Sequence, residues 1–123
     1  MAVFGIRGAT TVEANEATDI LTATKELLGI MLRQNGLKVE ELAGVFLTTT
    51  RDLDAVFPAQ AARDLGWDLV PLLGGVEAAV KGSLERCVRV LILANTDKTQ
   101  REIRHVYLRG AASLRPDMGG DDR

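Results

Sequence analysis

Hydrophobic and polar positions alternate with two different periods in the first third of the chain. Residues 2–12 are apolar or alternate with polar residues, a pattern typical of a β-strand. Apolar residues then recur every three or four positions, the period of an α-helix, at Ile20, Ala23, Leu27 and Met31. This spacing predicts one long helix over residues 16–35, with Asn15 able to cap its start and Gly36 suited to end it.

Strand-like and turn-like segments follow one another in the middle of the chain. Residues 42–50, LAGVFLTTT, are rich in branched and aromatic residues, which predicts a second strand. Pro58 suits the first turn of a short helix that ends near Gly66. Residues 67–73 predict a third strand, in which Pro71 indicates a sheet edge or a bulge.

The last part of the chain predicts short elements around one strongly apolar strand. Residues 74–86 are interrupted by glycines and are loop-like, whereas residues 86–94 predict the central strand. A single helical turn is expected within residues 95–104. Two short strands are expected at residues 105–108 and 111–114.

This order of elements predicts an α+β fold with a mixed β-sheet, one long helix and one short helix. A sheet whose strands are apolar on both sides needs cover on both faces. The two expected helices can cover only one face. We therefore expect a homo-oligomer in which the sheets of separate copies pack against each other.

Length, charge and composition narrow the function classes. The chain has 123 residues, which predicts a single domain over residues 1–115 followed by a mobile polar tail over residues 116–123. A net charge of −2 argues against nucleic acid or an anionic membrane as the main partner. With no signal-peptide core and no apolar run near the ~20 residues of a membrane span, we expect a cytoplasmic protein.

Residue types for metal binding and nucleophilic catalysis are scarce. His105 and Cys87 are the single histidine and the single cysteine, so they form neither a His/Cys metal cluster nor a disulfide within the chain. Neither Ser83 nor Ser113 lies in a nucleophile-elbow sequence, and the glycine-rich segments match no nucleotide-binding fingerprint. We expect no metal and no cofactor, a small buried role for Cys87 and a structural role for His105.

An arginine interrupts the most apolar segment of the chain. Arg89 lies within CVRVLIL, residues 87–93, and a buried guanidinium needs a partner because burying an unpaired charge is very costly. The partner is either a carboxylate of the protein or an anionic ligand. Other charged or polar residues in apolar surroundings are candidates for the same site: Arg7, Arg63, Glu77, Tyr107 and Arg115. Several arginines suggest a small substrate with more than one carboxylate, acted on by positioning and electrostatics.

Four segments, in order and over almost the whole chain, resemble one known family. They are GIRGATTVE, DLDAVFPAQAARDLGW, RCVRVLI and IRHVYL…LRPD. They resemble the trimeric, mixed-sheet class of monofunctional chorismate mutase. The resemblance implies a homotrimer with a barrel-like core of sheets, helices outside and active sites at the subunit interfaces. It also implies the pericyclic rearrangement of chorismate to prephenate in phenylalanine and tyrosine biosynthesis, without cofactor, metal or covalent intermediate.

The resemblance also implies roles for individual residues. Arg89 would donate to the ether oxygen of chorismate and to a carboxylate, and Glu77 would accept from the ring hydroxyl near developing positive charge. Arg7 and Tyr107 would hold the carboxylate of the enolpyruvyl side chain. The remaining residues would line the pocket or its mouth: Phe57, Leu73, Gly74, Leu114, Arg63 and Arg115.

Three departures from some family members concern affinity more than reaction type. Gln60 stands where some members have a lysine, which removes a positive charge at the mouth. Gly74 stands where some have a cysteine, which leaves only backbone contacts there. The segment RDLGW is one residue shorter than in some relatives.

Three other interpretations stay open at this point. The chain could be a non-catalytic trimeric binding or regulatory protein for an aromatic-pathway dicarboxylate. It could be a small trimeric enzyme of another kind, such as an enamine or imine deaminase. Arg89 and Glu77 could also pair with each other in a purely structural role.

Overall fold

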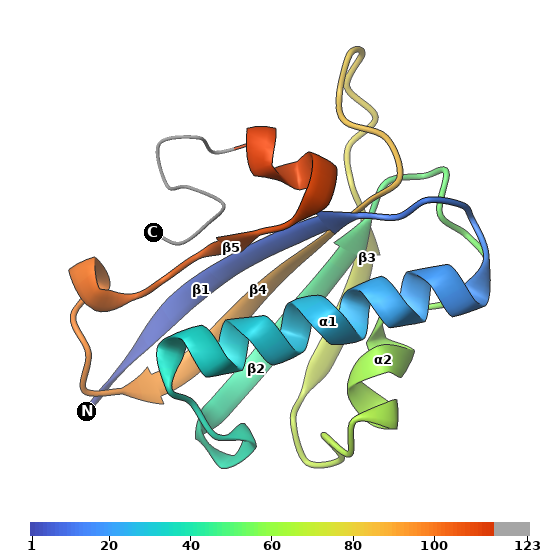
Figure 1. Ribbon diagram of the computed structural model, residues 1–123. Coiled ribbons are helices and arrows are strands. Elements are labelled where there is room, and N and C mark those ends of the chain that lie inside the picture. Colours follow the sequence, from blue (N-terminus) through green and yellow to red (C-terminus); the bar gives the residue numbers. More distant parts are fainter. Residues whose placement is uncertain (115–123) are drawn as a thin grey trace.

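The computed structural model describes residues 1–114. Its centre is a five-stranded sheet in the order β3-β2-β4-β1-β5 (Figure 1). The strands are β1 (Ala2–Thr11), β2 (Leu42–Thr49), β3 (Leu72–Val76), β4 (Cys87–Thr96) and β5 (Val106–Tyr107). The central strand β4 pairs antiparallel with β1 and β2, and the outer strands β3 and β5 pair parallel with their neighbours. The predicted mixed sheet and α+β fold are therefore confirmed.

Two α-helices lie on the same face of this sheet. They are α1 (Ala17–Asn35) and α2 (Ala59–Asp64), one long and one short as the sequence predicts. The buried side of α1 includes Ile20, Ala23, Leu27 and Met31, which confirms the predicted apolar stripe. The smaller 3₁₀ helices are η1 (Val39–Glu41), η2 (Gln100–Glu102) and η3 (Arg109–Ser113).

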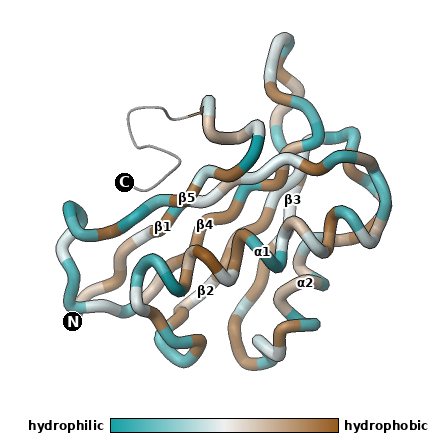
Figure 2. The backbone as a smooth tube through the Cα atoms, viewed as in Figure 1, coloured by the Kyte–Doolittle hydropathy of each residue, from teal (hydrophilic) through white to brown (hydrophobic). Residues whose placement is uncertain are grey.

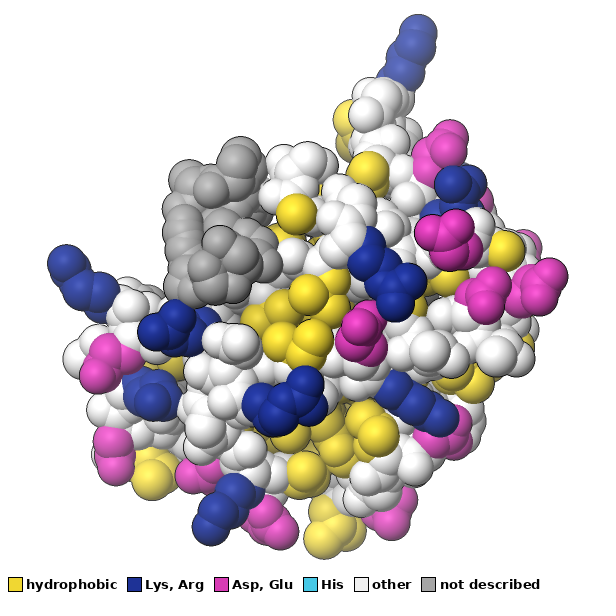
Figure 3. Space-filling view, viewed as in Figure 1, with side chains coloured by type: hydrophobic (Ala, Val, Ile, Leu, Met, Phe, Trp, Pro, Cys, Tyr) yellow, Lys and Arg dark blue, Asp and Glu magenta, His cyan; other side chains and the backbone are white. Residues whose placement is uncertain are grey.

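The two ends of α1 are determined by different interactions. Gly36 ends the helix in the left-handed conformation, at φ 60°, and its N–H donates to carbonyls of the last turn. Acidic side chains gather where α1 begins, at the right of Figure 3, which suits the positive end of the helix dipole. The expected N-cap is wrong: Glu16 occupies that position, and Asn15 instead bonds to the backbone N–H groups of Asp54 and Ala55.

The sheet and α1 approach closely at one glycine. A Cβ on Gly8 of β1 would lie within contact distance of Met31 Sδ and 3.2 Å from Leu27 Cδ1. Only a residue without a side chain leaves room for this pair of buried side chains. Figure 2 shows hydrophobic segments both on the strands and on the helix α1 that covers them.

The third strand begins and ends later than the sequence predicts. Residues 67–71 lie outside the sheet and include a turn at residues 68–69, and β3 extends through Gly74 and Gly75, which were expected to lie in a loop. Backbone pairing with β2 defines this edge strand, with Leu73 opposite Phe46 and Gly75 opposite Thr48. Glycine weakens a strand but does not prevent pairing at an edge, where β2 supplies the partner groups.

The strand expected at residues 111–114 is also wrong, because this segment belongs to η3 and its C-cap. The chain leaves the sheet after Tyr107 and reverses at Arg109, whose φ is 52°. The N–H of Ala111 then donates to the carbonyl of Leu108, a local bond that replaces sheet pairing. Helical geometry suits the two alanines at this point.

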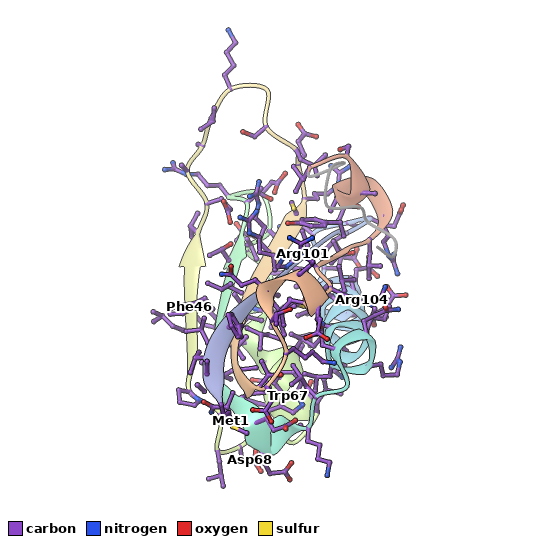
Figure 4. The ribbon with its side chains drawn as sticks, turned by 90° about the vertical axis from the view of Figure 1, so that its left-hand side faces the viewer. Met1, Phe46, Trp67, Asp68, Arg101 and Arg104 are labelled. Atoms are coloured by element: carbon purple, nitrogen blue, oxygen red, sulfur yellow. The ribbon has the colours of Figure 1, made fainter. Side chains whose placement is uncertain are left out.

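Among residues 1–114, no helix covers the opposite face of the sheet along β2, β3 and β4. In Figure 4, the helices lie on one side of the sheet, and Phe46 projects away from them on the other. Phe46, Leu73 and Leu91 are all exposed there. The uncovered apolar face expected from the count of helices is therefore present. Among residues 1–114, the structure contains no helix with the length and hydrophobicity of a membrane span.

Candidate active site

The strand register gathers the candidate residues on the uncovered face. Arg89 of β4 lies opposite Thr48 of β2 and Ala9 of β1, and Ala9 in turn lies opposite Tyr107 of β5. Arg7 lies two residues before Ala9 on β1 and therefore points to the same face. Neighbouring positions in this row are about 5 Å apart between strands, so side chains from four strands converge.

A hollow of about 350 Å³ lies where these side chains meet. Five of the predicted site residues line it: Arg7, Glu77, Arg89, Tyr107 and Leu114. Phe46 and Leu91 give it an apolar wall. The structure thus brings together both residues expected to be catalytic and three of those expected to bind substrate.

Arg89 is less buried than its apolar neighbours suggest. Its side chain is 50% exposed, because it points to the uncovered face while Val88 and Val90 point toward the helices. Its Nε lies 3.8 Å from Glu77 Oε2, longer than a charge-assisted hydrogen bond of about 2.7–2.9 Å. This is the only ion pair of Arg89 within residues 1–114. The guanidinium therefore has donors available for an anion.

Glu77 is placed by the edge of the sheet. Its N–H donates to the carbonyl of Thr49 at 2.8 Å, which extends the pairing of β3 with β2 by one residue. Its carboxylate accepts a short hydrogen bond from the hydroxyl of Thr48 and is one-quarter exposed, at 25%. Sequence reasoning missed Thr48. The alternation of LAGVFLTTT places it on the same face as Phe46, and this could have identified it.

Arg7 and Tyr107 are placed by the pairing of β1 with β5. The backbone N–H of Arg7 donates to His105 Nδ1 at 2.9 Å, and Leu108 donates to the carbonyl of Ala9. Tyr107 is buried at one end of the hollow, whereas the Arg7 side chain is exposed. This bond supports the structural role expected for His105, which stays a prediction.

Cys87 lies two residues before Arg89 on β4. It belongs to a small apolar cluster with Ala9, Tyr107 and Ala111. Burial raises the pKa of its thiol above the ordinary value of 9.0, although the positive charge of Arg89 opposes this shift. Cys87 is therefore a neutral thiol at physiological pH. The predicted small, buried role is confirmed by its complete burial.

Other predicted site residues lie at a second hollow, of about 750 Å³, between α2, the loop before it and β3. Phe57, Arg63 and Gly74 line this second hollow. Leu73 lies beside Gly74 but points to the uncovered face, next to Phe46. Within one chain, these four residues do not join the hollow around Arg89.

Two expectations lie outside the described residues, namely the role of Arg115 and the mobile tail over residues 116–123. Across residues 1–114, no group of three or more His, Cys, Asp and Glu side chains is arranged to hold a metal ion.

Fold and site together define an α+β protein with a hollow lined by Arg7, Arg89 and Glu77 on the open face of its sheet. Residues 3–118 match the family model of chorismate mutase type I. The chain is 55% identical to chorismate mutase AroH of Thermus thermophilus over 94% of this chain and 96% of that protein. It is 46% identical to chorismate mutase AroH of Bacillus subtilis over 96% of this chain and 94% of that protein.

A solved structure agrees with the sequence relatives. The chorismate mutase of Clostridium thermocellum superimposes with a TM-score of 0.87 at 48% identity, covering 88% of this chain and 96% of that chain. The chain belongs to the chorismate mutase type I family, and it is an isomerase.

Proposed function

We propose that this enzyme converts chorismate to prephenate at a site that includes the hollow around Arg89. The observation that carries this proposal is the half-exposed guanidinium of Arg89, which has donors available beside the carboxylate of Glu77. A positive guanidinium and a negative carboxylate lie apart from each other on an apolar surface. This arrangement fits a reaction whose transition state separates positive from negative charge.

The charge distribution of the transition state indicates which part of chorismate each side chain contacts. The ether C–O bond of chorismate breaks ahead of C–C bond formation, so negative charge builds on the ether oxygen and positive charge spreads over the ring. Arg89 donates to that oxygen, and Glu77 accepts from the ring hydroxyl near the positive charge. Both interactions strengthen as charge develops, and such differential binding lowers the barrier. Arg7 and Tyr107 hold the side-chain carboxylate, which favours the compact reactive conformer.

The second half of the site comes from another copy of the chain in this proposal. Phe57 is 79% exposed and Leu73 is 61% exposed, and both lie near the outer strand β3. An apolar face that is open along β2 and β4 supports contact between sheets. We propose that Phe57, Arg63, Leu73 and Gly74 of one subunit complete the hollow around Arg89 of the next. The number of three subunits follows from the family resemblance.

A purely structural role for Arg89 and Glu77 fits the geometry less well. A structural pair would be short and buried, whereas this one is long and half-exposed.

Location in the cytoplasm and independence of metals and cofactors stay predictions. So do the single domain over residues 1–115 and the absence of a nucleic-acid or membrane partner.

A direct assay tests the proposed reaction. The purified protein is incubated with chorismate, and loss of the diene absorbance is followed with and without a chelator. We expect acceleration over the buffer blank that exhaustive chelation leaves unchanged. No acceleration would contradict the proposal, and activity that is lost on chelation and restored by a divalent ion would contradict metal independence.

A further inference from the structure

Thr48 lies between the two charged groups of the site and contacts one of them. The register places it opposite Arg89 on β4 and opposite Gly75 on β3, with its side chain on the uncovered face. Its hydroxyl donates to Glu77 Oε2, the same oxygen that faces Arg89 Nε at 3.8 Å. Thr48 and Arg89 therefore face the same carboxylate oxygen, but only Thr48 is within hydrogen-bonding distance of it.

The backbone around Thr48 favours this geometry. A Cβ at Gly75 would lie 3.7 Å from Thr48 Cγ2, so the neighbouring position on β3 holds no side chain that could separate Thr48 from Glu77. A threonine side chain is stiff at χ1 because its Cβ is branched. The hydroxyl direction is therefore fixed by the strand before any ligand arrives.

The second carboxylate oxygen of Glu77 has no partner in the part of the chain that the structure describes. Within residues 1–114, no hydrogen bond or ion pair engages Oε1. An ionised carboxylate and a guanidinium readily form two parallel hydrogen bonds when nothing restrains them. Such a closed pair would occupy Glu77 and would remove donors of Arg89 that an anion needs.

We infer that Thr48 is a positioning residue that keeps the Arg89–Glu77 pair open. By holding Oε2, it prevents Glu77 from rotating into a closed pair and leaves Oε1 to accept a hydroxyl of the substrate. The inference rests on the proposed function for the identity of that substrate. It adds a polar residue of β2 to a hollow that is otherwise lined by charged, aromatic and apolar residues.

The isosteric change Thr48→Val tests the inference, because it removes the hydroxyl and keeps the shape. We expect kcat/KM for chorismate to fall about tenfold to a hundredfold, the range for losing a hydrogen bond to a charged group. Thr48→Ser keeps the hydroxyl and should stay within about threefold of the parent. Thr24→Val is the matched control, since the Thr24 hydroxyl bonds only within α1, at 2.7 Å to the carbonyl of Ile20.

A crystal structure of ligand-free Thr48→Val provides a readout that does not depend on activity. We expect the Arg89–Glu77 distance to shorten to about 2.7–2.9 Å, the length of a charge-assisted hydrogen bond. An unchanged distance would overturn the inference even if the parent rearranges chorismate. Equal losses in Thr48→Val and Thr48→Ser would also overturn it, as would full activity in Thr48→Val. Inactivity of the parent would contradict only the proposed function.

Discussion

Arg89 is held by its strand and not by a closed ion pair. The β4 backbone places it between Thr48 and Ala9, and its long contact with Glu77 leaves the planar fork of the guanidinium accessible. A planar fork can reach two oxygens at once, whereas a lysine ammonium acts as a point charge. Replacing Arg89 by lysine therefore keeps the positive charge and removes the planar fork, so the two contributions can be measured separately.

Arg89→Lys should fold like the parent and lose most of its turnover. The side chain is half-exposed and its ion pair is loose, so its contribution to stability is small. Losing one preorganised donor typically costs about 10²–10³ in rate. Thermal unfolding without ligand and turnover on chorismate are the two measurements. Normal folding with turnover within about threefold of the parent would exclude the electrostatic role.

The sequence predicted the identity of this residue but not its surroundings. An arginine within CVRVLIL indicates a special site, but the pattern does not show which face of the sheet has no helix. Thr48 was missed for a related reason. The role inferred for Thr48 depends on its contact with Glu77, which lies 29 residues away along the chain.

At the scale of elements, long periodic segments were the most predictable. The apolar stripe of α1 and the branched residues of β2 and β4 each match a single structural period. The boundaries of β3 and the nature of η3 were not predictable, because long-range pairing with β2 and local bonds around Ala111 determine them.

The contact between α1 and β1 gives a stability test. Gly8→Ala should destabilise the fold by about 1–3 kcal/mol, since the new methyl group overlaps Met31 and crowds Leu27. Gly29→Ala is the matched control on the outer side of α1, where only the flexible end of Arg33 lies nearby, at 3.3 Å. It should stabilise the protein by about 0.5–1 kcal/mol.

Urea unfolding of both glycine variants provides the measurement. A Gly8→Ala protein as stable as the parent would mean that the Met31 side chain moves aside without cost and that close packing at Gly8 does not stabilise the fold.

The turn that leads into β4 gives a pH test. Asp52 accepts hydrogen bonds from the N–H of Arg86, at 3.0 Å, and from the Thr50 hydroxyl, at 2.5 Å. Burial opposes ionisation of Asp52, but these bonds outweigh it and hold its pKa below the ordinary value of 3.8. Because the pKa is lowered by folding, the stabilisation is present at neutral pH and is lost as the pH falls through the folded value.

Asp52→Asn should therefore lower the free energy of unfolding at pH 7, by less than about 1 kcal/mol because Asp52 is exposed. The difference between variant and parent should shrink below about pH 4. Denaturant unfolding at pH 7 and pH 3 measures it. A difference that stays constant across this range would show that ionisation of Asp52 does not stabilise the turn.

At the scale of the whole molecule, the predicted site residues divide into two hollows. Arg89 and Arg7 line one, and Phe57 and Arg63 line the other. The sequence could identify these residues through the family resemblance. It could not show that one chain keeps them apart, because that depends on the sheet between them. In the proposed assembly, contact between subunits joins the two halves.

Mixed assemblies of two inactive variants test this claim most directly. Arg89→Ala damages the first hollow, and Arg63→Glu damages the second through charge reversal. Each variant alone should lose most of its activity. The two variants are then refolded together in equal amounts. An interface site is intact where a subunit with an undamaged Arg89 hollow meets a subunit with an undamaged Arg63 hollow. Random association in a ring of like subunits predicts about one quarter of the parental activity.

The matched control mixes Arg89→Ala with Arg7→Ala. Both changes lie in the first hollow, so every site is damaged and no activity should return. We expect recovery to about one quarter of the parental activity in the first mixture and none in the control. A first mixture no more active than the average of its two components would contradict a site shared between subunits.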